Sequence, residues 1–258
     1  MSSKNKVVAV VGPTGSGKTA LASALARHYN GVIVSADSRQ VYRGLDSGTN
    51  KEGVPGTWQG ETARVIDGVP QLLIDIAQPG SRFTLADWLA EAERLLEKIW
   101  AAGQLPIVTG GTGLYVTALL EGYQPGEGRY AQKRRARNFQ ALILQSDVER
   151  AQLYQHSDER FPRVFDAVVR ESESLVKTGV PYQWLEAIGL DYRYAAYYLQ
   201  GTLPRQAAID QFCQASRHYI RRQLTWWRHH GPTQLVKTVA EATQAVEDFL
   251  KDGENPVI

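Results

Sequence analysis

The sequence predicts an α/β fold: a parallel sheet core of the P-loop NTPase-like type, flanked by helices, with a mostly helical C-terminal half. An apolar, β-branched run at 7–11 leads through a glycine-rich turn into a helical pattern. Further short apolar runs alternate with helical stretches, and helical stripes dominate from residue 146. We therefore expect a P-loop α/β core at 1–145 and a mainly helical part at 146–258, packed on the core.

Composition narrows the class of protein. The 258 residues are 43% hydrophobic and 22% charged, which excludes a disordered chain, and the net charge of +2 does not by itself indicate nucleic-acid binding. The single cysteine, Cys213, excludes an intramolecular disulfide framework and fits a reducing compartment. Residues 1–6 lack the apolar region of a signal peptide, and no run approaches the length of a membrane span. We expect a cytoplasmic monomer with no membrane partner.

Residues 12–19, GPTGSGKT, match the P-loop pattern G-x-x-x-x-G-K-[ST] between a predicted strand and a predicted helix at 19–29. The glycines allow a tight turn whose N–H groups point inward, and the helix start adds its positive end. Lys18 supplies a mobile positive charge, and the Thr19 hydroxyl can hold Mg²⁺. The motif predicts an oligophosphate cradle rather than a plain turn, but leaves the phosphate compound open.

A second short strand, 32–34, ends just before Asp37. In a strand–helix–strand unit the loop after the second strand lies at the same sheet edge as the P-loop. Asp37 is therefore expected to face the bound phosphate compound. At that place it could ligate Mg²⁺, act as a base, or cap the next turn.

The next stretch, residues 44–70, is rich in glycine and also contains proline. Residues 44–70 are expected to form a loop-rich flap. The run 71–75 resembles a Walker B strand that ends at Asp75, although a solvated strand end fits equally well. Thr84 and Asp87 predict a capping box that opens a core helix reaching to residue 103.

A second strand–glycine–helix unit follows at 105–115, with the sequence GGTGLY at 110–115. Its glycines allow a close approach to a ligand, and Thr112 offers a hydroxyl at a helix start. A further core strand is expected at 138–144, after a basic linker at 129–137.

The C-terminal half is predicted to be helical, with a capping box formed by Ser146 and Glu149 and a helix that ends near residue 179. A short helix is expected at 182–188, one long helix at 204–230 and an amphipathic helix at 238–251. The segment 217–230 mixes four arginines, three histidines and two tryptophans with no acid. Such a run suits phosphate and base contacts, although a solvated basic face is the alternative.

The chain resembles the tRNA dimethylallyltransferases in a set of motifs that occur in the same order. These motifs are the P-loop at 12–19, SADSRQVYRGLDSG at 35–48, LID at 73–75, GGTGLY at 110–115, Ile188-Gly189 and RQLTWWR at 222–228. The resemblance implies that the P-loop holds the diphosphate of dimethylallyl diphosphate instead of ATP. The acceptor it implies is the exocyclic amine of an adenine beside the anticodon of tRNA, which is flipped out of its loop.

The resemblance also implies roles for particular residues, with Mg²⁺ as the cofactor. The resemblance implies that Asp37 is the general base and that Thr19 and Lys18 are catalytic as well. It further implies that Thr19 binds the Mg²⁺. The implied diphosphate-binding residues are Gly12, Pro13, Thr14, Gly15, Ser16, Gly17, Lys18, Thr19 and Arg217. The residues implied to contact the tRNA are Asp37, Ser38, Arg39, Gln40, Thr112 and Arg222.

The chain departs from this family at two places. Only residues 121–137 stand where bacterial members carry a helical insertion that grips the anticodon arm, so we expect a shortened form. Leu190 and Asp191 follow Ile188-Gly189 where the family usually places a tyrosine, and Tyr192 could take its place. Three alternatives remain at this point: prenylation of a free adenine nucleotide, an ATP-binding small-molecule kinase, and a non-catalytic RNA-binding protein.

Overall fold

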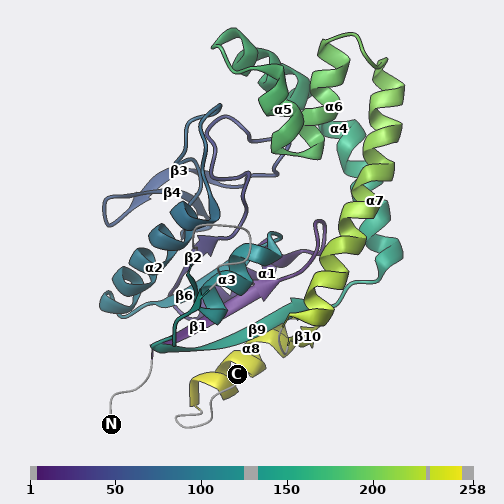
Figure 1. Cartoon of the computed structure of the whole chain (residues 1–258). Helices are drawn as coiled ribbons and strands as arrows, with labels where there is room; N and C mark the ends of the chain where they lie inside the picture. The colour runs from purple at the N-terminus through teal and green to yellow at the C-terminus, as the bar shows by residue number, and fades with distance from the viewer. Residues whose placement is uncertain (1–4, 125–132, 231–232, 252–258) are drawn as a thin grey trace.

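The computed structural model describes residues 5–124, 133–230 and 233–251, and a twisted sheet of eight strands lies at its centre (Figure 1). Neighbouring strands are parallel from β10 to β5, and β4 and β3 continue the sheet in antiparallel pairing. In sheet order the strands are β10 (Gln234–Val236), β9 (Phe139–Ser146), β1 (Asn5–Val11), β6 (Leu105–Gly110), β2 (Gly31–Ser35), β5 (Val69–Leu72), β4 (Glu61–Ile66) and β3 (Val54–Trp58). A separate short ladder joins β7 (Tyr123–Gln124) to β8 (Lys133–Arg134).

Helices cover both faces of the sheet because the central strands are apolar on both sides. Val8 and Val10 of β1 pack in the cluster that holds α1 (Lys18–His28) and α8 (Val239–Lys251). Val7, Ala9 and Val11 point the other way, into the cluster of α2 (Leu85–Ala101) and α3 (Gly113–Glu121). A strand that is apolar on both faces is the pattern of a buried parallel sheet.

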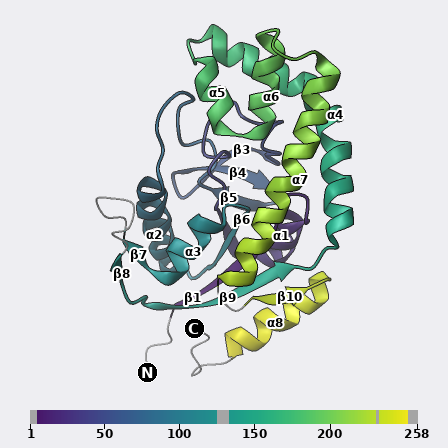
Figure 2. The ribbon, with the colours of Figure 1, turned by 45° about the vertical axis from the view of Figure 1, so that its right-hand side comes forward.

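The helical half consists of α4 (Arg150–Lys177), α5 (Tyr182–Ile188), α6 (Leu190–Leu199) and α7 (Arg205–His229). Its own core is aromatic: the rings of Phe161 and Phe212 stack with centroids 3.6 Å apart. Helix α7 runs from this bundle down to α3 and the sheet, where its Trp227 joins the core of the α2 and α3 face (Figure 2). The two halves thus share one core, and the boundary at residue 145 stays a prediction.

Most predicted elements are confirmed, including the Thr84–Asp87 capping box at the start of α2. Two predictions are wrong. Residues 44–70 are not simply a loop-rich flap, because they contain β3, β4 and the start of β5, an antiparallel edge where glycine and proline are tolerated. Ser146 and Glu149 form no capping box, because Ser146 ends β9 and Glu149 caps α4 without a side-chain hydrogen bond. Sequence analysis also missed α6 and β10.

The basic linker predicted at 129–137 lies partly outside the described residues, and residues 133–134 of it form β8. Among the described helices, none combines the length and apolar composition that crossing a membrane requires.

Asp75 does not face the P-loop but belongs to a cluster of four charges. The side chain of Lys51 has 0% exposure, and its Nζ donates to Asp75 at 2.6 Å and to Asp46 at 3.2 Å. Arg64 donates to the same two carboxylates at 2.6 and 2.8 Å. Although burial disfavours its charged form, Lys51 and Arg64 hold the pKa of Asp46 below its usual 3.8. The cluster fastens the loop 37–53 to the antiparallel edge of the sheet.

Replacing Lys51 with methionine is expected to lower the free energy of unfolding by about 3 kcal/mol, because two carboxylates are left to share Arg64. Urea unfolding at neutral pH measures the change. Lys177→Met, which removes an exposed pair on α4, serves as the control and should cost less than about 0.5 kcal/mol. Equal losses of unfolding free energy in the two variants would contradict this role of the cluster.

The cluster also predicts how stability depends on pH. Asp46 has a lowered pKa, so its contribution to the free energy of unfolding is present above pH 3.8 and is lost as the pH falls through its folded pKa.

Candidate functional site

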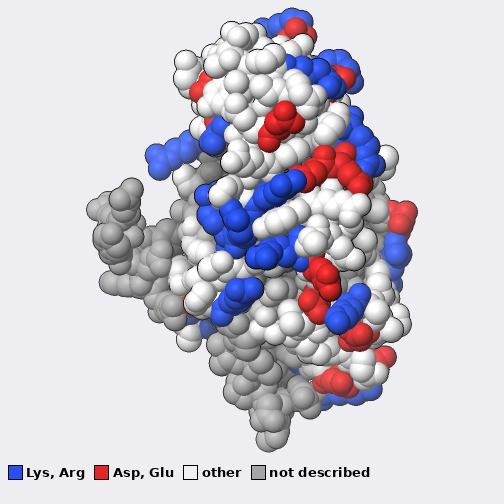
Figure 3. All heavy atoms as spheres, turned by 90° about the vertical axis from the view of Figure 1, so that its right-hand side faces the viewer, with Lys and Arg blue, Asp and Glu red and all other residues white. Residues whose placement is uncertain are grey.

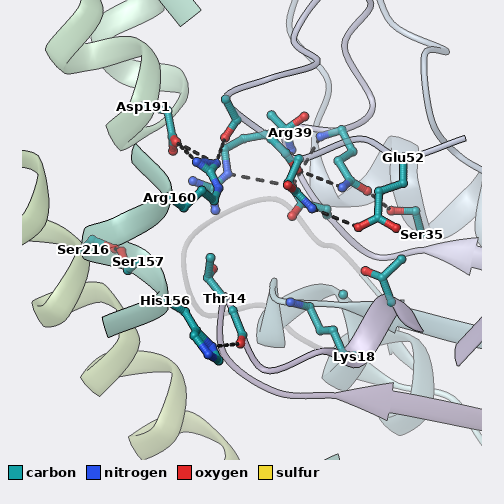
Figure 4. Close-up of a pocket in the computed structure, with 18 of the residues that line it drawn as sticks. Thr14, Lys18, Ser35, Arg39, Glu52, His156, Ser157, Arg160, Asp191 and Ser216 are labelled. Atoms are coloured by element: carbon teal, nitrogen blue, oxygen red, sulfur yellow. Dashed lines mark hydrogen bonds and ion pairs between the residues drawn. The ribbon is translucent and has the colours of Figure 1, made fainter. Parts of the chain in front are cut away.

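A cavity of about 310 Å³ opens at the carboxyl ends of β1, β2 and β6, between the sheet and the helices α4, α6 and α7 (Figure 4). The sheet side contributes the P-loop and the residues after β2, and the helical side contributes α4, the start of α6 and α7. The carboxyl edge of a parallel sheet is where open α/β folds bind their ligands. The position of the cavity therefore agrees with the edge predicted from sequence.

The P-loop leaves β1 through glycines in conformations that other residues resist. Gly15 and Gly17 have φ of 81° and 75°, and a Cβ on Gly12 would lie 2.7 Å from the Ser16 Oγ. The Ser16 Oγ is buried and makes no hydrogen bond within the described chain. Buried polar atoms normally have partners, so this cradle is built to receive a polar ligand.

Lys18 supplies the charge of the cradle. Its Nζ donates to the Pro13 carbonyl at 3.3 Å, and its side chain lines the cavity together with Thr19. Burial lowers the pKa of Lys18, Asp37 counteracts this shift, and Arg39 adds to it. The lysine is therefore held where it would gain from an anionic partner.

Asp37 lines the same cavity as the P-loop and also caps its own turn. Its Oδ1 accepts from the backbone N–H groups of Arg39 and Gln40, at 2.9 and 3.3 Å. Its Oδ2 accepts no hydrogen bond from the described residues. The cap predicted as one alternative is thus present, and it leaves one carboxylate oxygen available for chemistry.

The second glycine-rich turn packs against the segment that carries Asp37. A Cβ on Gly110 would lie 2.2 Å from the Ala36 carbonyl oxygen, so only glycine fits there. The Thr112 Oγ1 accepts from the backbone N–H of Ser38 at 3.2 Å, and the Thr112 N–H donates to the Ala36 carbonyl at 3.3 Å. The turn at 110–112 therefore fixes where Asp37 stands.

Arg39 extends from this segment toward α7. It donates to the Tyr219 hydroxyl at 3.1 Å, and its side chain is 18% exposed. Burial opposes its charge, but Tyr219, Asp37 and Asp191 together raise the pKa of Arg39 above its usual range. It stays a cation inside the cavity.

Sequence analysis missed the residues that α4 and α6 bring to the cavity. Arg160 donates twice to the Asp191 Oδ1, at 3.0 and 2.9 Å, and once to the Gly48 carbonyl at 2.8 Å. Burial raises the pKa of Asp191, against the opposing charge of Arg160 and Arg39. The Nδ1 of His156 donates to the Gly15 carbonyl oxygen at 3.1 Å. No motif surrounds Arg160 or His156, so only the fold reveals them.

Leu190 and Asp191, the two residues that depart from the family pattern, both line the cavity, and Tyr192 does not. Tyr192 is buried instead, and its hydroxyl donates to Glu171 at 2.7 Å. The departure noted in the sequence thus places a carboxylate, paired with Arg160, in the cavity wall.

The arginines of α7 lie on the outer surface. Figure 3 shows Lys and Arg gathered across the middle of the face that carries α4 and α7. Arg217 is half exposed, and its Nε donates to Asp158 at 3.1 Å. Arg222 is exposed, with its guanidinium 5.8 Å from the Tyr219 ring centre. Neither lines the cavity.

The fold brings eight of the predicted site residues to one cavity. They are Thr14, Gly15, Gly17, Lys18, Thr19, Asp37, Arg39 and Gln40. The other predicted residues do not line it. They are Gly12, Pro13, Ser16, Ser38, Thr112, Arg217 and Arg222.

Comparison with known proteins gives consistent matches over most of the chain. A family model described as IPP transferase matches residues 40–137 and 124–230, and one described as isopentenyl transferase matches residues 5–57. The chain is 31% identical to the tRNA dimethylallyltransferase of Streptococcus pneumoniae (strain Hungary19A-6), over 96% of this chain and 100% of that protein. That alignment spans 304 positions, more than the 258 residues of this chain, so it contains positions at which this chain has no residue. Such gaps are expected for a shortened form.

Two further relatives agree. The tRNA dimethylallyltransferase of Streptococcus sanguinis (strain SK36) is 30% identical, over 88% of this chain and 90% of that protein. The crystal structure of the tRNA isopentenylpyrophosphate transferase from Bacillus halodurans superposes with a TM-score of 0.80 and 27% identity, covering 96% of each chain.

The lowered pKa of Lys18 predicts how anion binding depends on pH. Sulfate, whose charge is constant between pH 7 and 11, is expected to bind less tightly as the pH rises, because Lys18, whose pKa is lowered by its partial burial, loses its proton below the usual 10.5. Titration calorimetry across this range measures the affinity. In Lys18→Arg, which stays charged, the decline should be weaker or shifted to higher pH. Identical profiles in the two proteins would show that Lys18 does not carry the effect.

Proposed function

The chain belongs to the IPP transferase family, and on that premise we propose which residues of its cavity act on the donor and which act on the acceptor of a prenyl transfer. The enzyme is a prenyltransferase that modifies an adenine of tRNA. The observation that carries our proposal is the meeting of the P-loop and Asp37 in one cavity. The P-loop serves the leaving group and Asp37 serves the nucleophile.

We assign the diphosphate of dimethylallyl diphosphate to the P-loop. The P-loop backbone, the positive end of α1 and the Lys18 ammonium favour a polyanion there. These groups are fixed before the substrate arrives, so they stabilise charge on the departing diphosphate without reorganisation. Arg39 and Arg160 add positive charge from the opposite wall.

Thr19 would hold Mg²⁺ together with the phosphate oxygens of the donor. No group of three His, Cys, Asp or Glu in the described part of the chain could bind a metal alone, and Mg²⁺ usually takes few protein ligands beside phosphates and water. When bound, the ion offsets negative charge on the leaving group. We infer that Arg160, and not Arg217, meets the diphosphate, because Arg160 lines the cavity whereas Arg217 lies outside it and pairs with Asp158.

The nucleophile is the exocyclic amine of an adenine beside the anticodon. Its nitrogen forms a bond to the first carbon of the allyl group, the bond from that carbon to the diphosphate oxygen breaks, and the diphosphate leaves with the electron pair. The free Oδ2 of Asp37 takes the proton that the amine releases. The Oδ1 keeps the turn in place meanwhile, because it is held by two backbone N–H groups.

The acceptor RNA would lie over the segment 37–40 and the exposed side of α7. Ser38, Arg39 and Gln40 follow Asp37, and Thr112 holds the Ser38 backbone from the neighbouring turn. Arg222 lies outside the cavity, where it can meet RNA phosphates rather than the donor.

The direct test supplies labelled dimethylallyl diphosphate and Mg²⁺ with either unmodified tRNA or AMP. Label is expected in the tRNA. Label that appears in AMP alone would overturn tRNA as the acceptor and favour a free adenine nucleotide instead.

Asp37→Asn isolates the role of Asp37 as a base. The asparagine keeps an oxygen that can cap the turn, but it cannot take the amine proton, so kcat should fall by about 10²- to 10⁴-fold. Calorimetry should find donor binding nearly unchanged, because the P-loop is untouched.

The control is Asp67→Asn, in the exposed turn between β4 and β5, where φ is 49° and asparagine is tolerated. Its kcat should equal that of the native enzyme. Full activity in Asp37→Asn would remove Asp37 as the base.

A further inference from the structure

Gln223 of α7 links the two glycine-rich turns of the site. Its Oε1 accepts from the Thr14 backbone N–H at 3.1 Å, and its Nε2 donates to the Gly111 carbonyl at 2.8 Å. An N–H can only donate and a carbonyl can only accept, so these partners fix the orientation of the amide. Gln223 is 6% exposed, so water has little access to replace either bond.

The bridge leaves no spare room. A Cβ on Gly111 would lie 2.8 Å from the Gln223 Nε2 and 3.8 Å from the Lys18 Nζ. A Cβ on Gly113 would lie 2.4 Å from Trp226, whose Nε1 donates to Thr117 of α3 at 3.1 Å. The inner face of α7 is thus seated directly on the second turn, and a shift of the helix would move that turn.

The bridge continues to the residue that prepares the nucleophile. Gly111 precedes Thr112, which accepts from the Ser38 N–H, and Ser38 follows Asp37. On the other side, Thr14 belongs to the loop that ends in Lys18. One amide therefore spans the cradle of the leaving group and the turn that positions Asp37.

We propose that Gln223 is a positioning residue for prenyl transfer, which sets the separation between the donor cradle and the Asp37 turn. This inference rests on the proposed function of the cavity. It requires that each turn can still bind its own ligand when the bridge is lost, while the reacting atoms are no longer aligned. Misalignment of that kind slows the reacting complex more than it weakens binding.

The test compares kcat and KM for dimethylallyl diphosphate and tRNA in Gln223→Met and Gln223→Glu. The methionine is neutral and similar in length but makes neither hydrogen bond. The glutamate can still accept from Thr14 but cannot donate to Gly111. We expect kcat to fall by about 10- to 100-fold in both. KM for the donor should stay within about threefold in the methionine variant and rise only in the glutamate variant, whose charge repels the diphosphate.

Gln214→Met and Gln214→Glu, on the exposed side of the same helix, are the matched controls and should keep the native kcat. Thermal unfolding and the fraction of active protein correct for any loss of folded enzyme. If Gln223→Met does not fold, Gln223→Glu and the shorter Gln223→Asn carry the test. A native kcat per folded molecule, or a loss seen only in KM, would overturn the proposal.

A double-mutant cycle with Thr112→Val tests whether the contacts act as one chain. Because both variants disturb the same turn, their combined effect on kcat should be smaller than the product of the separate effects. Independent, multiplying effects would contradict the linkage. A native enzyme that transfers no label to tRNA would instead refute the proposed function, so the two failures are distinguishable.

Discussion

The parallel pairing of β1 with β6 is the constraint on which the site depends. It sets Val11 beside Gly110, so the P-loop and the second glycine-rich turn emerge at the same edge of the sheet. Because β2 pairs with β6 on the other side, the segment that carries Asp37 emerges there as well. Gly110 lets that segment approach so closely that a Cβ would overlap the Ala36 carbonyl. Backbone geometry alone therefore brings the cradle, the turn and the carboxylate together.

The helical half completes this edge and determines its electrostatics. Helix α4 brings Arg160 and His156 to the cavity, and α7 brings Tyr219, which holds Arg39. Within this cavity, burial lowers the pKa of Lys18 and raises that of Asp191. A partly buried cation is poorly solvated, so it favours an anionic ligand. The helices that line the cavity thus also contribute charged side chains to it.

The sheet core and the first half of the site were predictable from sequence, because motifs there carry backbone requirements. The glycines of 12–17 and 110–113 indicate tight turns, and Asp37 lies two residues after a buried strand. Arg160, Asp191 and Gln223 act through long-range contacts between helices, and helical periodicity does not reveal which residues of two distant helices meet. The prediction of a flap at 44–70 is wrong because glycine and proline indicate turns without excluding the short edge strands between them. Arg217 lies in a basic run, but its partner Asp158 is on another helix.

We propose that the P-loop of this enzyme holds the diphosphate leaving group rather than a nucleoside triphosphate. Its most direct test is a competition measured by calorimetry, with dimethylallyl diphosphate and ATP titrated separately and together in the presence of Mg²⁺ and with phosphate release followed in parallel. We expect that dimethylallyl diphosphate binds, that ATP at the same concentration does not displace it, and that no phosphate is released. Tighter binding of ATP accompanied by phosphoryl transfer would contradict it.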